Sequence, residues 1–188
     1  MKKSIGAKTI VYPTPVFIVG TYDKDGKPNV MNAAWGGICC SDPPCVAVSV
    51  RKARHTYDAI VLREAFTISI PSEEHAAQAD FFGMASGKQK DKLAVAGLTA
   101  VRSELVDAPY VGEFPLVLEC KLAHTFDLGV HTQFVGEIVD VKADETILGS
   151  NGLPEAEKLK PFWFAPGSSV YHATGPILGK AFSIGRSV

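Results

Sequence analysis

PNVMNAAWGGICCSDPPCVAVSVRKARHT, residues 28–56, is the stretch from which the fold and the site can best be inferred. It begins with two asparagines and small residues beside Trp35, continues into the apolar run 45–50, and ends in a basic cluster before Thr56. Small residues edged with amides favour a flat apolar surface, whereas arginines before a helix start favour an anion site. The stretch therefore predicts a pocket for a ligand that is flat at one end and anionic at the other.

Short apolar runs separated by turn residues predict strands in the first half of the chain. The segment 23–26, Asp-Lys-Asp-Gly, is a typical hairpin turn. The predicted strands are 16–22, 29–35, 45–51 and 66–70. The predicted helices are 56–64 with Thr56 as its cap, 73–82 with Ser72 as its cap, and a short helix that Gly97 ends.

The second half is predicted to be mostly β-structure. Residues 116–123 alternate in a way that gives one buried face, a hairpin turn with Gly129 spans 127–130, and 133–141 is the return strand. Residues 149–160 are predicted to be loop with one helical turn. Many short strands with few helices predict a mainly β or α+β fold, a barrel capped by helices, in a single domain over residues 1–188.

The composition excludes several classes of protein. A net charge of −1 over 188 residues argues against a nucleic-acid-binding protein. No run approaches the ~20 apolar residues of a membrane-spanning helix. The start, MKKSIGAKTIVYPTP, lacks the apolar run and cleavage site of a signal peptide. We therefore expect a cytoplasmic protein with no membrane partner.

Three of the four cysteines, Cys39, Cys40 and Cys45, lie close together in the sequence. Adjacent cysteines rarely bridge each other because a disulfide needs converging side chains. A metal or iron–sulfur site would need the distant Cys120 as a fourth ligand, so we expect no metal. We interpret the cysteines as buried or half-buried thiols, with a redox role for Cys39 or Cys40 beside the bound ligand as the alternative.

Two basic segments, 51–56 and 86–92, are candidates for binding a phosphate. The first precedes a predicted helix, whose free N–H groups favour an anion, and the second has a glycine that permits close backbone approach. The alternatives are a solvated turn and a flexible lysine-rich loop. Of the lysines in the second segment, we expect Lys92 to bind and Lys88 and Lys90 to face water. Neither a dinucleotide-binding glycine motif nor a P-loop motif is present. The candidate residues are Arg51, Arg54, Thr56, Ser86, Gly87 and Lys92.

Five blocks of the sequence, in this order and spacing, resemble the flavin reductase-like family. They are NVMNAAW (29–35), DPPCVAVSVRKARHTYDAI (42–60), MASGKQKDKL (84–93), LGVHTQFVGEIVDV (128–141) and FWFAPGSSVYHATG (162–175). The resemblance covers nearly the whole chain. It implies an FMN-binding split β-barrel of Greek-key type with capping helices, and FMN as the cofactor.

The resemblance also implies where each end of FMN would lie. The phosphate would meet the six residues of the two basic segments. His131 would lie close to the flavin as a hydrogen-bond donor or proton carrier. Phe164 and Tyr171 would reach the flavin from the aromatic C-terminal segment, whose alternatives are a core plug or a dimer contact. The ring would lie against Asn29, Met31, Asn32, Ala33, Ala34, Trp35, Ser49 and Val50.

Three functions follow from these residues and the resemblance. The first is an electron carrier that serves a redox protein partner. The second is an NAD(P)H:flavin oxidoreductase that supplies reduced FMN to a monooxygenase, with the nicotinamide nucleotide binding transiently. The third, disfavoured because the phosphate and ring positions carry competent residues, is a barrel without cofactor. The resemblance further implies a homodimer, and the neutral Asn29 and Asn32 lead us to expect an uncharged ring end and a low redox potential.

Overall fold

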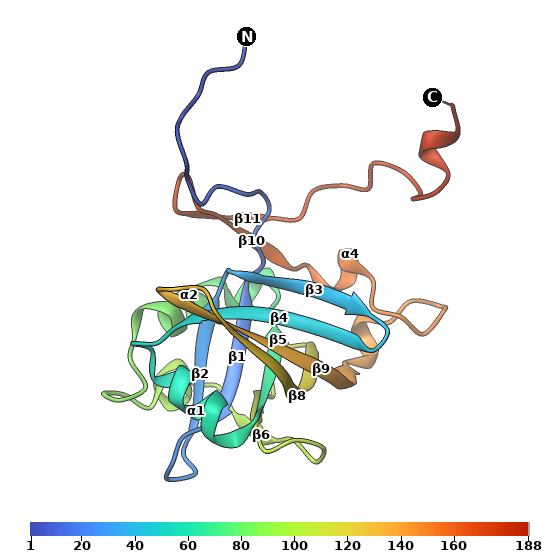
Figure 1. Ribbon diagram of the computed structural model, residues 1–188. Helices are drawn as coiled ribbons and strands as arrows, with labels where there is room; N and C mark the ends of the chain where they lie inside the picture. Colours follow the sequence, from blue (N-terminus) through green and yellow to red (C-terminus); the bar gives the residue numbers. More distant parts are fainter. Residues whose placement is uncertain (188) are drawn as a thin grey trace.

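The computed structural model describes residues 1–187 and is built on one antiparallel seven-stranded sheet with the order β2-β1-β5-β8-β9-β4-β3 (Figure 1). Two small two-stranded sheets, β6 with β7 and β10 with β11, lie outside it. The strands of the large sheet are β1 (Phe17–Tyr22), β2 (Pro28–Ala33), β3 (Gly36–Ser41), β4 (Pro44–Arg51), β5 (Ala65–Ile70), β8 (Leu116–Asp127) and β9 (His131–Ala143). The others are β6 (Ala100–Arg102), β7 (Pro109–Val111), β10 (Phe162–Ala165) and β11 (Val170–Ala173).

The large sheet curls around an apolar core. Met31 of β2 and Val48 of β4 belong to the same buried cluster, although their strands lie near opposite ends of the strand order. Phe66 and Phe134, both fully buried, fill the centre of this cluster. The sheet is therefore a barrel with β2 and β3 as its edge strands, and it remains open between β2 and residues 49–51 of β4, which β3 does not pair with. The short link 34–35 crosses that opening into β3.

Both predicted hairpin turns are confirmed. Between β1 and β2, the carboxylate of Asp23 accepts hydrogen bonds from the N–H groups of Asp25 and Lys27, each 2.9 Å long. Between β8 and β9, Asp127 accepts from the N–H of Gly129, which has a φ of 90°. Aspartate and glycine at these positions satisfy the backbone of a tight turn without strain.

A second core cluster lies on the outer side of β1 and β2. Phe82 of α2 and Leu93 of α3 pack there against Ile18 and Val30, and Phe162 of β10 joins them. These helices therefore cover the same strands that border the opening of the barrel. The helices are α1 (His55–Arg63), α2 (Ala76–Met84), α3 (Lys92–Ala96) and α4 (Ala156–Leu159), with 3-10 turns η1 (Glu73–His75), η2 (Glu145–Ile147) and η3 (Ile184–Ser187).

The predicted helix caps are wrong. The N-cap of α1 is Arg54, and no side chain caps it, because Thr56 is inside the helix and is buried at its first turn. Ser72 precedes η1 without a capping bond, since its hydroxyl donates to Glu74 instead. In contrast, Gly97 ends α3 with a φ of 67°, and α4 is the helical turn predicted within 149–160.

Several strands were not predicted, and one predicted strand is too long. The strand predicted for 29–35 ends at Ala33, so Ala34 and Trp35 lie beyond it. The strand β3 and the four strands of the two small sheets have no alternating apolar pattern in the sequence. Their pairing comes from tertiary contacts, which short segments need for their stability.

The single buried face predicted for residues 116–123 is also wrong. Glu119 and Cys120 are neighbours and are both fully buried, and the register with β9 shifts between them. The Nζ of Lys142 lies 3.2 Å from a carboxylate oxygen of Glu119 and partly neutralises this buried charge. The unpaired residue at this bulge is Val139 of β9, and burial on β8 does not follow a strict alternation beside it.

Both ends of the chain extend from the β10–β11 side of the body (Figure 1). The N-terminal arm is attached where the backbones of Thr14 and Phe164 bond each other, 3.0 and 3.3 Å apart. Apolar side chains on both arms are exposed, including Ile5, Leu178 and Phe182. Within residues 1–187, the helices are all too short or too polar to span a bilayer.

Candidate cofactor site

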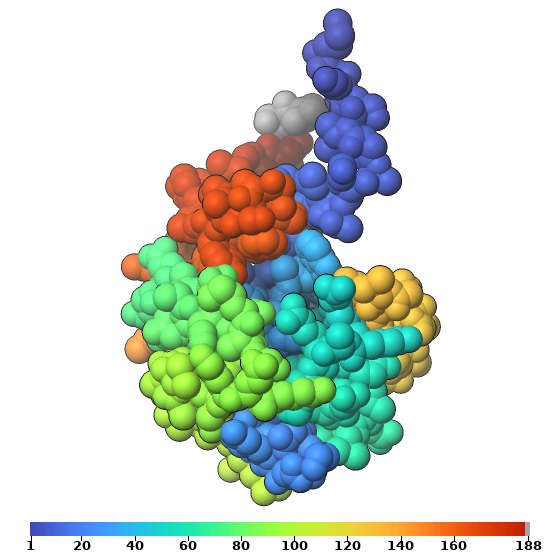
Figure 2. Space-filling model, turned by 90° about the vertical axis from the view of Figure 1, so that its left-hand side faces the viewer, coloured from blue at the N-terminus to red at the C-terminus, as the bar shows by residue number. Residues whose placement is uncertain are grey.

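Two adjoining cavities lie at the opening of the barrel and gather most of the predicted site residues. The smaller has a volume of about 60 Å³ and the larger about 210 Å³, and Met31 and Arg54 line both. Figure 2 shows the surface above them as a furrow between the segment of α2 and its following loop, in green, and the end of β4 with α1, in cyan. A ligand that occupies both cavities would extend along this furrow.

The smaller cavity is positively charged. Lys92 is 5% exposed, and its Nζ donates to the carbonyl oxygens of Phe82 and Ala85, 3.1 and 3.3 Å away. Burial and the nearby Arg54 guanidinium lower the pKa of Lys92 to about 8. Among the described residues, no carboxylate forms an ion pair with Lys92. A buried ammonium without a counter-ion favours an anionic ligand.

Hydrogen-bond donors complete this cavity. The side-chain amide of Asn29 donates to the Thr56 hydroxyl over 2.9 Å, which leaves the Thr56 proton free to be donated to a ligand. Asn29 Oδ1 is buried and has no partner among residues 1–187. A Cβ at Gly87 would lie 2.1 Å from that oxygen, so only glycine allows the 86–87 loop to approach so closely. The first residues of α1, His55 and Thr56, also line this cavity.

The small cavity therefore brings together most of the predicted phosphate residues. Arg54, Thr56, Ser86, Gly87 and Lys92 all line it. Asn29 was expected at the ring but also lines this smaller cavity, where its amide donates a hydrogen bond to the Thr56 hydroxyl. Lys88 and Lys90 are exposed, as predicted.

The larger cavity has one apolar wall and one charged rim. Val50 is almost fully buried in its wall, whereas Arg51 is exposed. Arg51 lies directly opposite His131 in the pairing of β4 with β9. The expectation of an uncharged wall does not hold here, because Arg51 was assigned to the phosphate end and lines the larger cavity instead. The cavity is lined by Met31, Asn32, Ala33, Ala34, Trp35, Ser49, Val50, Arg51, Arg54, His131 and Phe164.

Tyr171 lies behind the larger cavity rather than in its lining. Its hydroxyl donates to Asp80 over 3.0 Å and accepts from the amide of Asn32 over 3.3 Å. Burial, followed by the hydrogen bond to Asp80, raises the pKa of Tyr171 to about 12. The Asn32 amide also donates to the carbonyl of Ala79 over 3.0 Å, so its orientation is held by two acceptors. Tyr171 and Asp80 thus position Asn32.

Sequence reasoning missed Asp80, since nothing near it in the chain marks it as part of a site. It lies on α2, and its partner Tyr171 follows 91 residues later. Only the docking of β10–β11 against α2 brings the two together. Phe164 supports the same contact, because its ring centroid lies 5.6 Å from that of Tyr171.

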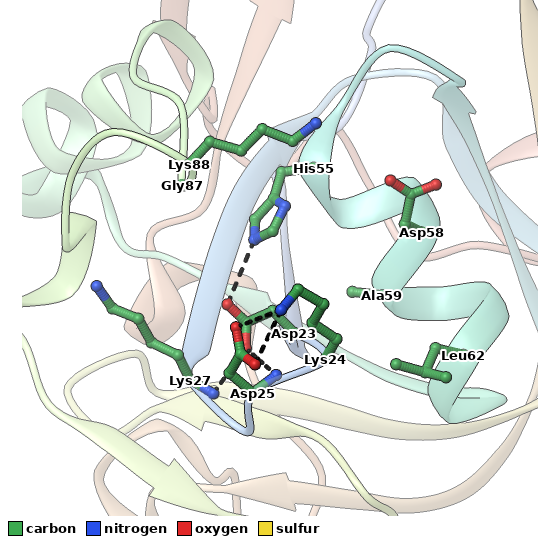
Figure 3. A pocket seen from close by; sticks show the side chains of 10 residues that line it. All are labelled: Asp23, Lys24, Asp25, Lys27, His55, Asp58, Ala59, Leu62, Gly87 and Lys88. Atoms are coloured by element: carbon green, nitrogen blue, oxygen red, sulfur yellow. Dashed lines mark hydrogen bonds and ion pairs between the residues drawn. The ribbon is translucent and has the colours of Figure 1, made fainter.

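A groove of about 460 Å³ continues from the smaller cavity, with which it shares His55 and Gly87 (Figure 3). His55 Nε2 points toward Asp23 Oδ2, 3.6 Å away, between the β1–β2 turn and α1. Lys88 and Asp58 lie at the rim of this groove. Because the groove carries charges of both signs, it does not favour an anion, whereas the adjoining smaller cavity does.

The chain is similar in sequence and structure to known proteins. It is 57% identical to flavoredoxin of Desulfovibrio vulgaris (Miyazaki F), with a TM-score of 0.95, covering 99% of this chain and 100% of that one. For flavoredoxin from Methanosarcina acetivorans, the identity is 29% and the TM-score 0.93, covering 100% and 98%. Over 148 residues, this chain is also 32% identical to a high molecular weight rubredoxin of Moorella thermoacetica, and the match covers 78% of this chain and 58% of that one. The chain spans 58 to 65% of the length of several curated relatives that it matches.

The model of one protein family, the flavin reductase like domain, matches residues 9–164. This range includes both cavities and every strand of the large sheet. The predicted fold class, a mainly β split barrel with a few capping helices, is confirmed by the strand-rich sheet and by these relatives. The chain belongs to the flavin reductase-like family.

Proposed function

We propose that the protein binds FMN across the two cavities and works as an electron carrier. The observation that carries the proposal is the arrangement of the site: a cavity lined by the buried Lys92, which forms no ion pair with a carboxylate of the described residues, adjoins a larger cavity with small and aromatic walls. FMN has a dianionic phosphate at one end and a flat heteroaromatic ring at the other. When bound, it supplies the ability to accept and release electrons singly or in pairs.

The smaller cavity would hold the phosphate. Thr56 donates its hydroxyl proton, Lys92 and Arg54 supply positive charge, and Gly87 leaves room for the phosphate oxygens. A hydrogen bond to a charged group contributes about 1.5–3 kcal/mol. Three such contacts in a buried cavity are sufficient to make the phosphate a major determinant of affinity.

The larger cavity would hold the ring. Asn32, with its amide protons directed to Ala79 and Tyr171, presents its carbonyl oxygen as an acceptor for the ring edge. Trp35 and Phe164 exclude water from the faces of the ring. His131 and Arg51 lie side by side at the rim, where His131 can hold or release a proton as the charge of the ring changes.

The similarity to two flavoredoxins over almost the full chain supports the carrier function. The relative in Moorella, a high molecular weight rubredoxin, carries the name of an electron-transfer protein. We propose a redox protein as the partner and the cytoplasm as the location. The second candidate is an NAD(P)H:flavin oxidoreductase, which the exposed Arg51 favours, since a cation at the rim would attract a nicotinamide nucleotide.

We also propose that the protein is a homodimer. Among the rings of the aromatic C-terminal segment, Phe162 is buried and Phe164 and Tyr171 are half-buried against their own chain. The two arms expose much more apolar surface, since Leu178 is 90% and Phe182 96% exposed. A second copy would cover these side chains. Light scattering should find a dimer for the full chain and weaker dimerisation for a variant without residues 176–188. A monomeric full chain would contradict the proposal.

Stopped-flow mixing of the FMN-loaded protein with NADH or NADPH distinguishes the two redox functions. For a carrier, we expect flavin reduction by either nucleotide to be too slow to support turnover, whereas a reduced ferredoxin-type protein should bleach the flavin within seconds. Fast, saturable reduction by one nucleotide would instead establish the reductase. Absence of bound flavin after incubation with FMN would remove both.

A further inference from the structure

A cluster of three thiols lies on the β3–β4 hairpin, outside the cofactor site. The strand β3 is at the edge of the large sheet and pairs with β4, with a register shift between Ile38 and Cys40. In such a bulge, two residues of one strand lie opposite a single residue of the other. Cys39 and Cys40 therefore both lie opposite Cys45, and Cys40 is its direct partner in the register.

The three thiols differ in their access to solvent. Cys39 and Cys40 are exposed, whereas Cys45 is 6% exposed. Burial, and then the nearby thiols of Cys40 and Cys39, raise the pKa of the Cys45 thiol. The Cys40 thiol donates to the carbonyl oxygen of Asp42 over 3.4 Å, which holds it beside the turn. An accessible thiol thus lies next to a protected one, as in a pair that reacts in two steps.

An antiparallel pairing such as that of Cys40 with Cys45 has backbone dimensions that suit a disulfide. Residues directly opposite each other in an antiparallel pair have Cα atoms about 4.5–5.5 Å apart. Disulfides join Cα atoms about 4.4–6.8 Å apart. Bridging Cys40 to Cys45 therefore requires no change of register, whereas the neighbours Cys39 and Cys40 do not converge. Cys120 is fully buried, and burial raises its pKa to about 12, so it is the least reactive thiol.

We propose that Cys40 and Cys45 form a redox-active dithiol–disulfide pair that reacts with disulfide compounds. The Cys40 thiolate attacks one sulfur of the disulfide RSSR and releases RS⁻, which takes up the proton that Cys40 lost. Cys45 then loses its proton and attacks the Cys40 sulfur, forming the Cys40–Cys45 bond and releasing the second RS⁻, which is protonated. Two protein thiols are oxidised, and one RSSR is reduced to two RSH.

This site is separate from the proposed flavin site. Cys45 is the second residue of β4, and the lining of the larger cavity reaches this strand four residues later at Ser49, which corresponds to ~13 Å along a strand. In Figure 1, the turn of this hairpin lies at the end of β4 that is remote from α1. Among the described residues, no group of three or more His, Cys, Asp or Glu side chains is arranged to hold a metal ion. Thiol–disulfide exchange is thus the chemistry that the cluster favours.

Oxidised glutathione tests the proposal on the full chain in its flavin-loaded form. After incubation, the protein is unfolded in excess alkylating reagent and its intact mass is measured. We expect two of the four cysteines to escape alkylation, and peptide mapping to find the Cys40–Cys45 bond. Cys39→Ser and Cys120→Ser should behave like the unsubstituted protein, whereas Cys40→Ser and Cys45→Ala should lose the bond.

Three results would contradict the Cys40–Cys45 pair. Four alkylated cysteines in the unsubstituted protein, a bond that persists in Cys40→Ser, or a bond between two chains would each overturn the proposal. Circular dichroism of every variant before oxidation ensures that folded proteins are compared. Because the readout is thiol alkylation, it does not depend on whether the flavin carries electrons, so failure of the proposed function would be seen separately in the flavin absorbance.

Discussion

The two cavities of the site differ in the chemistry of the residues that line them. The smaller is narrow and rich in donors, and its buried lysine, Lys92, has no carboxylate partner among the described residues. The larger is wider and has an apolar wall. The Asn32 amide in its lining is held by a hydrogen bond to Ala79, and the exposed Arg51 places positive charge at its rim. The contrast suggests a division of labour: the smaller cavity sets the affinity through the phosphate, and the larger sets the properties of the ring. Substitutions in the two cavities should therefore affect FMN and riboflavin differently.

The largest effect is expected from Lys92→Met. It removes a buried positive charge beside the phosphate, so FMN affinity should fall by about 100-fold, which corresponds to ~3 kcal/mol. Riboflavin lacks the phosphate, and its affinity should be unchanged within about twofold. Lys88→Met, an exposed lysine four residues away, is the matched control and should leave both affinities intact. Fluorescence titration measures all of these; equal losses for the two ligands would disprove the division.

The pH dependence of FMN binding should reflect the same lysine. The pKa of Lys92 is about 8 in the free protein, and a phosphate dianion beside it raises that pKa. A group whose pKa rises on binding contributes affinity that is complete below the free pKa and is lost as pH climbs toward the bound pKa. FMN affinity should therefore fall by up to about tenfold per pH unit above pH ~8. Titrations between pH 7 and 9.5 should show this slope for FMN, but neither for riboflavin nor for Lys92→Met.

A smaller effect is expected at the rim of the larger cavity. Arg51→Gln removes a positive charge that stabilises the added negative charge of a reduced ring. Since Arg51 is exposed and screened, we expect a loss of about 1 kcal/mol, or a midpoint potential lower by about 20 mV for a two-electron couple. Lys52→Gln, at an adjacent residue whose side chain pairs with Asp127, should leave the potential unchanged. A potentiometric titration that finds the two variants alike would remove Arg51 from the ring.

The smallest effect is expected from Tyr171→Phe. It removes the hydroxyl that orients Asn32, while the Ala79 carbonyl still holds one amide proton. FMN and riboflavin should both weaken by about threefold to tenfold, because both present the same ring. Asp80→Asn should reproduce part of this loss. A loss confined to FMN would place Tyr171 at the phosphate end and contradict the assignment.

The local chemistry of the chain predicts the elements whose stability is local. The turns at Asp23–Gly26 and Asp127–Gly129 and the strand that includes Val46, Val48 and Val50 were predictable because each carries its own signal. The glycine that ends α3 belongs to the same class. The caps of α1 and η1 could not be predicted in this way, because Thr56 and Ser72 bond to other partners in the folded chain.

What the sequence could not predict depends on contacts between distant segments. The strand β3 is exposed and lacks alternation, so only its pairing with β4 makes it a strand. Arg51 was assigned to the phosphate end because it precedes α1, whereas the direction of its strand brings it to the larger cavity. Asp80 acts through Tyr171, and no local pattern marks such an indirect role. The sequence identifies which residues are competent, and the fold decides which cavity each of them lines.

A crystal structure of the protein with FMN is the most direct test of the two-part site. The account predicts the phosphate in the smaller cavity, within hydrogen-bond distance of Thr56 Oγ1 and Lys92 Nζ, and the ring between Trp35 and Phe164. A phosphate bound in the larger cavity beside Arg51, or in the groove of Figure 3 beside Lys88, would contradict it.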